Sequence, residues 1–364
     1  MFKDLYHYKP GIDKVVEAMT RTREDALRKR NGNILFRVLP PSDTQMYSDL
    51  TVNSYDYDNK IDDYIRDLSL AYAGSFEARK DIADDAIPVI TPILGIGDYS
   101  AFLAGDIYFS EDTSWSKPSL DEITEWRNLP DIGTTFWYRK FLEICDKLLE
   151  ASEGSGIPFT RGFFSPLDLA EALRGNELYY DFTDHPDKLH DLLDFCANAT
   201  IKFAEDIYAI ARKYLSSEKY GTWYIDDSIN MSEDIACMIS PELYREFGAP
   251  HTQKVIDHFG MGFMHTHSRA LYMVKEICDL KNVANLWLAT DPNQPVPVRC
   301  LDQLIPDAGS TCLAIDCSSF EEFESTLDKA LEGNVSYCLP VSTVEEGIEI
   351  TNRANELLER KGVK

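Results

Sequence analysis

Basic residues are scarce in this sequence. Its 364 residues include 36 Lys and Arg against 62 Asp and Glu, which gives a formal net charge of −26 at pH 7. A surface that binds nucleic acid or an anionic membrane has to be basic, because phosphate groups are negatively charged. The composition therefore argues against both partners, and a soluble partner, such as one with a basic docking face, fits better. We expect the substrate to be a small molecule.

Cysteine pairs and long apolar runs are also missing. The eight cysteines are scattered and none forms a C-x-x-C pair, so we expect free thiols in a reducing compartment. No stretch approaches the roughly 18 consecutive apolar residues that a membrane span needs. The first residues, MFKDLYHYKPG, lack the apolar core of a secretion signal. We expect a cytoplasmic protein. Neither a P-loop nor a G-x-G-x-x-G motif is present.

What the sequence does contain is a regular alternation of short apolar runs and helical patterns. The apolar runs are Ile34–Leu39, Ile87–Leu94, Pro158–Phe164, Thr222–Ile225, Gly262–His265, Ala284–Leu288, Thr311–Ile315 and Val335–Leu339. The clearest helical patterns are Lys188–Lys213, Pro241–Phe259, Phe320–Leu331 and Val344–Arg360. This alternation indicates βαβ units and a parallel sheet. Eight runs favour the α/β class and a closed (β/α)8 TIM barrel over an open, doubly wound sheet.

The whole chain, residues 1–364, is expected to form a single domain. Residues 1–32 form a helical extension, with a charged amphipathic helix over 11–31. Residues 40–86 and 95–157 are too long for ordinary βα loops, and both follow strands. Because barrel active sites lie at the carboxyl ends of the strands, we expect both insertions to cover that end.

The sharpest local feature is the H-x-H motif of His265 and His267, where the fifth apolar run ends. In a strand, side chains at i and i+2 point to the same face, so the two imidazoles should aim together. Two converging imidazoles are half of a zinc site. Cys338, near the end of the last strand, is the best third ligand, and Cys312 and Cys317 compete with it. The alternative is one core histidine and one surface histidine.

Carboxylates cluster after the fourth apolar run. Asp226 and Asp227 end that run, and Glu233 and Asp234 follow shortly after. Carboxylates are costly to bury unless they are paired or used, so acid–base or substrate-anchoring work is indicated for Asp226, Asp227 and Glu233. For Glu233 and Asp234, capping of the helix that begins near Ile235 is an equal alternative.

Two arginines and two further aspartates also end strands. Arg37 ends the first run and Arg161 lies in the third, and each could bind an anionic group of a cofactor or substrate. Internal salt bridges are the alternative for both. Asp291 and Asp316 could each orient a ligand histidine from behind.

Three further segments form a familiar set: FFSPLDLAEALRG at 163–175, the region 179–193 with its Asp-His-Pro-Asp, and ISPELY at 239–244. In their order and spacing they resemble the uroporphyrinogen decarboxylase superfamily. The resemblance runs from about residue 85 to the end and is weaker at the first strand. True uroporphyrinogen decarboxylases carry an arginine-rich first strand that binds the carboxylates of a tetrapyrrole. Here only Arg37 stands in that segment, so a decarboxylase of this type is the second interpretation.

The cobalamin-dependent methyltransferase branch is the first interpretation. The resemblance implies zinc held by a His-x-Cys at the fifth strand and a cysteine at the eighth. His265-Thr266-His267 and Cys338 fall on these positions, with His267 in place of the family's first cysteine. It further implies that zinc activates a substrate heteroatom, which exchanges a methyl group with cobalt. The chain lacks a D-x-H-x-x-G corrinoid motif, so the corrinoid would arrive on a partner protein. A non-catalytic binding barrel is the third interpretation.

Overall fold

A seven-stranded parallel sheet forms the centre of the molecule. The computed structural model describes residues 2–111, 113–215 and 228–363. The strands lie in the order β1-β9-β8-β7-β6-β5-β4. Their bounds are β1 Ile34–Leu39, β4 Gly162–Phe164, β5 Ile229–Ser232, β6 Gly262–His267, β7 Val283–Ala289, β8 Cys312–Asp316 and β9 Asn334–Pro340. A separate two-stranded hairpin consists of β2 Tyr108–Phe109 and β3 Ser114–Trp115.

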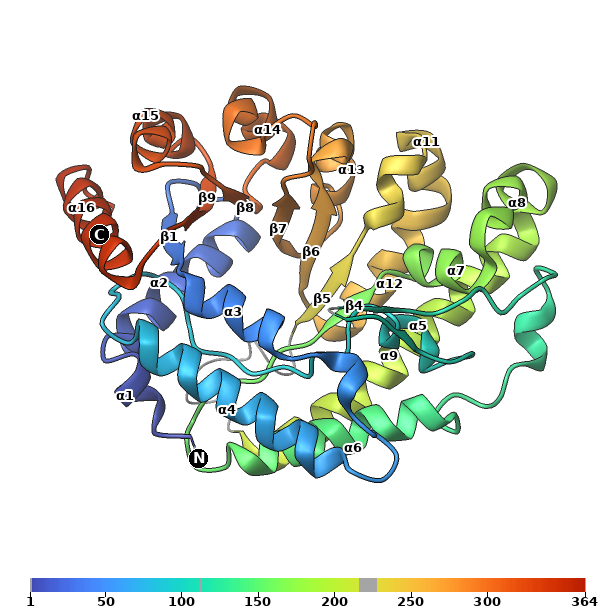
Figure 1. Ribbon diagram of the computed structural model, residues 1–364. Helices are drawn as coiled ribbons and strands as arrows, with labels where there is room; N and C mark the ends of the chain where they lie inside the picture. The colour runs from blue at the N-terminus through green and yellow to red at the C-terminus, as the bar shows by residue number, and fades with distance from the viewer. Residues whose placement is uncertain (1, 112, 216–227, 364) are drawn as a thin grey trace.

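Helices separate the strands along the chain and surround the sheet. Figure 1 shows α13 to α16 in an arc outside β6 to β9, while α4 and α6 lie along the other side. The longer helices are α2 Ile12–Leu27, α3 Pro41–Asp49, α4 Ile61–Arg79, α6 Phe136–Ala151, α7 Pro166–Arg174, α9 Pro186–Tyr214, α12 Ala249–Phe259, α14 Leu301–Ala308, α15 Phe320–Ala330 and α16 Val344–Arg360. The shorter ones are α1 Leu5–Tyr8, α5 Asp98–Ala101, α8 Leu178–Asp184, α11 Pro241–Leu243 and α13 Val274–Cys278. The α/β class expected from the sequence is confirmed. Within the described residues, no helix is both long and apolar enough to cross a membrane.

Several helices begin where the sequence provides a side-chain cap. The hydroxyl of Ser319 accepts a hydrogen bond from the backbone N–H of Glu322 at the start of α15. Thr343 does the same for Glu346 at the start of α16. Both are Ser/Thr-x-x-Glu patterns, which satisfy backbone donors that the first turn of a helix leaves free. These caps explain why the predicted and observed starts of α15 and α16 coincide.

The strand expected at Ile87–Leu94 is only a single bridge, between Ile90 and Phe159. Side chains, rather than a neighbouring strand, form hydrogen bonds with the backbone of this segment. The hydroxyl of Tyr64 bonds both the N–H and the carbonyl of Ile93, and Tyr72 does the same at Thr91. A backbone whose polar groups are satisfied by side chains does not need a neighbouring strand. The expectation of a regular strand here is therefore wrong.

The segment around this bridge nevertheless bonds to β1 on one side and to the residues just before β4 on the other. The N–H of Asp85 donates to the carbonyl of Phe36 in β1. On its other side, the N–H of Ile90 donates to Pro158, and the N–H of Thr160 donates back to Ile90. Residues 84–90 thus lie between the first and last strands of the sheet.

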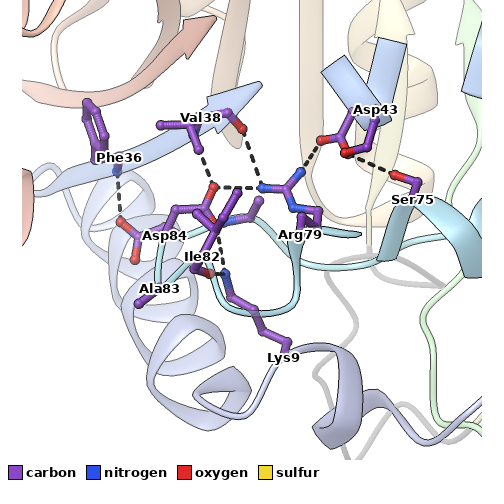
Figure 2. A network of polar contacts seen from close by, with 12 residues as sticks. Lys9, Phe36, Val38, Asp43, Ser75, Arg79, Ile82, Ala83 and Asp84 are labelled. Atoms are coloured by element: carbon purple, nitrogen blue, oxygen red, sulfur yellow. Dashed lines mark hydrogen bonds and ion pairs between the residues drawn. The ribbon is translucent and has the colours of Figure 1, made fainter. Parts of the chain in front are cut away.

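A buried network of charges fixes the edge of β1 (Figure 2). The Asp84 carboxylate accepts hydrogen bonds from the backbone N–H of Val38, the Lys9 ammonium and the Arg79 guanidinium, at 3.0, 2.6 and 2.7 Å. Arg79 also pairs with Asp43 at the start of α3. Asp84 is completely buried and Lys9 nearly so. The network ties the N-terminal segment and α4 to the first strand.

One end of the strands is covered and the other carries the polar residues. Ala26, in α2, packs with Met261, Phe263 and Ala284, which lie at the amino ends of β6 and β7. The opposite, carboxyl end of the strands is called the mouth below. The strand expected at 222–225 lies outside the described residues, and β5 pairs with β6 just after that segment.

Much of the two long insertions is packed helix. In the first, α4 packs against α6 of the second, and α6 packs against α9. Residues 96–118, by contrast, meet residues that follow β4 and β5, where they line a cavity described below. Residues 96–118 therefore lie beside the ends of β4 and β5, and a cover over the mouth by the rest of the two insertions stays a prediction.

Candidate metal centre and adjoining cavity

The ends of β5 and β6 bring a carboxylate beside the two histidines of the H-x-H motif. Ser232, which ends β5, is in register with His265. The N–H of Glu233 then donates to the carbonyl of His265 at 2.7 Å, and the Thr266 hydroxyl donates to the carbonyl of Glu233 at 2.8 Å. These bonds continue the pairing beyond the strand and deliver Asp234 to the face on which the imidazoles lie.

Asp234, His265 and His267 converge at the mouth. One ligand atom from each residue can be chosen so that all three lie within 4.8 Å of one another. Oδ1 of Asp234 lies 3.6 Å from Nε2 of His265 and 3.4 Å from Nε2 of His267. That oxygen is buried and has no hydrogen-bond partner. A buried carboxylate oxygen without a partner is costly, and a cation at this point would satisfy it.

The protonation of these groups fits a bound cation. Burial, followed by the neighbouring His267, lowers the pKa of His265 to about 4, so its imidazole is neutral at physiological pH. Neutral imidazole is the form that binds metals. Burial, followed by the negative charge of Asp168, raises the pKa of Asp234 above its usual range. The cluster is thus short of positive charge. Two imidazoles and one carboxylate form a ligand set that zinc accepts.

Asp291 orients one of the histidines. Its Oδ1 lies 2.9 Å from Nδ1 of His267, while the Arg269 guanidinium donates to its Oδ2 at 3.0 Å. The hydrogen bond from Arg269 is the main cause of the lowered pKa of Asp291, and that from His267 adds to it. A carboxylate behind a histidine fixes the tautomer that leaves Nε2 free to bind a metal.

We expect Asp291→Asn to weaken metal binding without unfolding the protein. The amide is isosteric but carries no charge, so it holds the His267 ring less firmly and makes Nε2 less basic. A loss of about 10- to 100-fold in metal affinity is typical of such a change. Competition with a chromophoric chelator measures it. Unchanged affinity would mean that His267 binds no metal.

Asp168 holds the loop that carries Asp234. Its carboxylate accepts hydrogen bonds from the Ser232 hydroxyl and from the backbone N–H groups of Asp234 and Ile235, the last two at 2.9 Å. Ser165 caps α7 through the N–H of Asp168. One side chain thus fixes both the end of β5 and the start of the following turn. Asp168 was absent from the residues proposed from the sequence, because only the tertiary structure brings α7 to this loop.

Glu233, expected to act in acid–base chemistry, is completely buried. Its carboxylate accepts hydrogen bonds from the hydroxyls of Ser165, Tyr244 and Thr252, at 3.0, 2.9 and 2.7 Å. Burial and the charge of Asp168 raise its pKa. Three protein donors occupy the group, which favours a positioning role, and a catalytic role stays a prediction. Asp226 and Asp227 lie outside the described residues.

Cys338 lies apart from the histidine cluster. It belongs to β9, in register with Arg37 on β1 and with Asp316 on β8. Strands β7 and β8 separate β9 from β6, and each step across a sheet is about 4.8 Å. Among the described residues, Cys338 is not part of the group of possible ligands. Burial raises the pKa of its thiol, and the Arg37 guanidinium bonds to it and opposes this shift.

The two arginines have different surroundings. Arg161 is buried, forms an ion pair with Asp98 at 2.7 Å, and lies over the rings of Tyr99 and Phe141. This internal pair is the alternative that the sequence left open. The Nε of Arg161 has no hydrogen-bond partner, and a cofactor-binding role for this residue stays a prediction. Arg37 lies beside Cys338, its partner in register on β9, and bonds to the thiol. Its Nε has no hydrogen-bond partner. Arg37 stays a predicted anion-binding residue.

A cavity of about 450 Å³ adjoins the cluster at Asp234. Its walls come from residues 96–118, from α7 and from the turn after β5. The lining residues are Ile96, Ser100, Trp115, Ser116, Pro118, Phe164, Asp168, Glu171, Ala172, Gly175, Tyr179, Asp234, Ile235 and Met238. This volume is typical of a site for a small molecule. The three converging side chains therefore have a cavity of small-molecule size beside them.

Comparison with known proteins finds a similarity of fold but none of sequence. No family model matches the sequence, and no curated protein matches it. Among solved structures, a methyltransferase from Methanosarcina mazei is similar, with a TM-score of 0.59 and 12% identity. The alignment covers 92% of this chain and 98% of that one. At this identity the similarity concerns the fold, which is shared over nearly the whole length.

Proposed function

We propose that the protein is a zinc-dependent methyltransferase whose metal is held by Asp234, His265 and His267. The convergence of these three side chains, with the unpartnered Oδ1 of Asp234 at its centre, is the observation that carries the proposal. Asp234 takes the place that the sequence analysis gave to Cys338. The result is a set of two nitrogen ligands and one oxygen ligand, which leaves a fourth position open.

Each surrounding residue has a defined task in this proposal. A bound zinc ion would supply Lewis acidity to a substrate heteroatom at the open position. Asp291 keeps a proton on Nδ1 of His267 and so presents Nε2 to the metal. Asp168 holds the backbone of Asp234 in place. The cavity positions the rest of the substrate and limits the access of water.

The methyl carrier in this proposal is a corrinoid brought by a separate protein. Support comes from the name of the structurally similar Methanosarcina mazei protein, a methyltransferase, and from the superfamily resemblance of the sequence. With a net charge of −26, the chain suits a partner that docks through a basic face. We also propose that residues 84–94 complete a (β/α)8 barrel, because this segment bonds to β1 and to the residues that lead into β4.

A decarboxylase acting on a polycarboxylate is less well supported. Among the described residues that line the cavity there is no lysine or arginine, and three are acidic. Arg161 is already paired with Asp98. A substrate with many carboxylates would be repelled from such a chamber.

Metal content and methyl transfer, measured on the same samples, test this proposal. Protein purified without chelator or affinity metal should hold about one zinc per chain. It should then convert cob(I)alamin to methylcobalamin with a methylated small molecule from a panel of ethers, thioethers and amines, followed by visible absorbance. Asp234→Ala should lose both properties, whereas Cys338→Ser should keep the zinc. Zinc binding without methyl transfer across the panel would overturn the function but not the metal site.

A further inference from the structure

The cavity beside Asp234 is acidic. Asp168 and Glu171 reach it from α7, and Asp234 reaches it from the turn after β5. Burial raises the pKa of Glu171, and the negative charge of Asp168 is the next cause. No cationic side chain is among the described lining residues. Lys117, the neighbour of two lining residues, holds its ammonium 4.3 Å from the centre of the Tyr108 ring. The described walls of the chamber therefore carry no positive charge.

The remaining walls are aromatic and apolar. Trp115, Phe164 and Tyr179 line the chamber together with Ile235 and Met238. Trp115 is 45% exposed even though it borders this chamber. Aromatic faces attract cations, and an apolar wall suits methyl groups. Carboxylates combined with aromatic rings form the type of site that recognises quaternary ammonium groups.

We infer that this cavity binds the methylated ammonium end of a small organic cation, whose other end carries the heteroatom that reaches the metal. The inference rests on the proposed function, because it names the substrate class for the same site. Asp168 and Glu171 supply the negative charge, and Trp115, Phe164 and Tyr179 supply the walls. Asp234, which borders both chamber and metal cluster, sets the distance between the two ends of the substrate.

Calorimetric titration of the zinc-loaded protein with choline and with 3,3-dimethyl-1-butanol tests this inference. The two probes have the same shape and the same hydroxyl, but the second has a neutral carbon in place of the charged nitrogen. We expect choline to bind at least about tenfold more tightly, because charge attraction and the aromatic walls act only on the cation. Rising salt concentration should weaken the binding of choline alone.

Two variants and a matched control locate the effect in the cavity. Glu171→Gln should weaken choline binding about fivefold and leave the neutral probe unaffected. Trp115→Leu should weaken choline binding about threefold, and the side chain is exposed enough for the fold to tolerate the change. Glu177→Gln makes the same charge change at an exposed residue outside the lining and should have no effect.

Failure of this inference can be distinguished from failure of the proposed function. Equal binding of the two probes, no binding of choline up to about 10 mM, or equal effects of Glu171→Gln and Glu177→Gln would overturn it. Zinc content, measured on the same samples, reports on the metal site independently. If the wild-type protein took up no zinc but still bound choline more tightly than 3,3-dimethyl-1-butanol, the cavity assignment would be supported and the proposed metal site would be wrong.

Discussion

Alanine at Asp234, His265 or His267 is expected to abolish stable zinc binding. Each variant removes one of the three proposed ligands, so its effect should exceed the roughly 10- to 100-fold loss expected from Asp291, which contacts only one of them, His267. The side chains lie at the mouth and are only partly buried, so the fold should remain. Metal analysis after gel filtration, together with chelator competition, measures the loss, and circular dichroism checks the fold.

A matched histidine serves as the control for this experiment. His258 lies on the surface in α12, where it pairs with Glu205. His258→Ala should retain zinc at the wild-type level. If all three cluster variants bound zinc as the wild type does, the metal would have to lie elsewhere and the proposed site would be wrong.

The largest effect on stability is expected from Asp84→Ala. The substitution leaves the ammonium of Lys9 and the guanidinium of Arg79 without their shared buried partner, and it frees the N–H of Val38. Breaking a buried ion pair by removing one partner costs about 3–5 kcal/mol. Denaturant unfolding followed by circular dichroism should show a free energy of unfolding lower by about this amount.

An exposed aspartate provides the comparison. Asp302 pairs with Lys329 at the surface, and its side chain is 96% exposed. Asp302→Ala should change the free energy of unfolding by less than about 0.5 kcal/mol. A similar small effect of Asp84→Ala would show that the network around β1 contributes little to stability.

The sequence predicted the elements whose signals are local. The strand at Ile34–Leu39 and the helix at Val344–Arg360 have the predicted bounds, because apolar runs and side-chain caps are encoded by neighbouring residues. The strand expected at Ile87–Leu94 differs, because its partners are the hydroxyls of Tyr64 and Tyr72. Those residues are distant in sequence, and no local pattern reveals them.

The same distinction applies to the candidate site. The spacing of His265 and His267 was enough to place both imidazoles on one face, where the structure has them. The position of Asp234 depends on the pairing of β5 with β6 and on the hydrogen bond from its backbone N–H to the Asp168 carboxylate. Neither contact is visible in one sequence. Cys338 also lies near a strand end, but the two strands that separate β9 from β6 are seen only in the sheet itself.

X-ray absorption spectroscopy at the zinc edge tests the metal site most directly. The protein is loaded with one equivalent of zinc and compared with Cys338→Ser and Asp234→Asn. We predict a first shell of nitrogen and oxygen at about 2.0–2.2 Å, with imidazole scattering, unchanged by Cys338→Ser and altered by Asp234→Asn. A sulfur ligand at about 2.3 Å that disappears in Cys338→Ser would contradict the assignment of Asp234 as the third ligand.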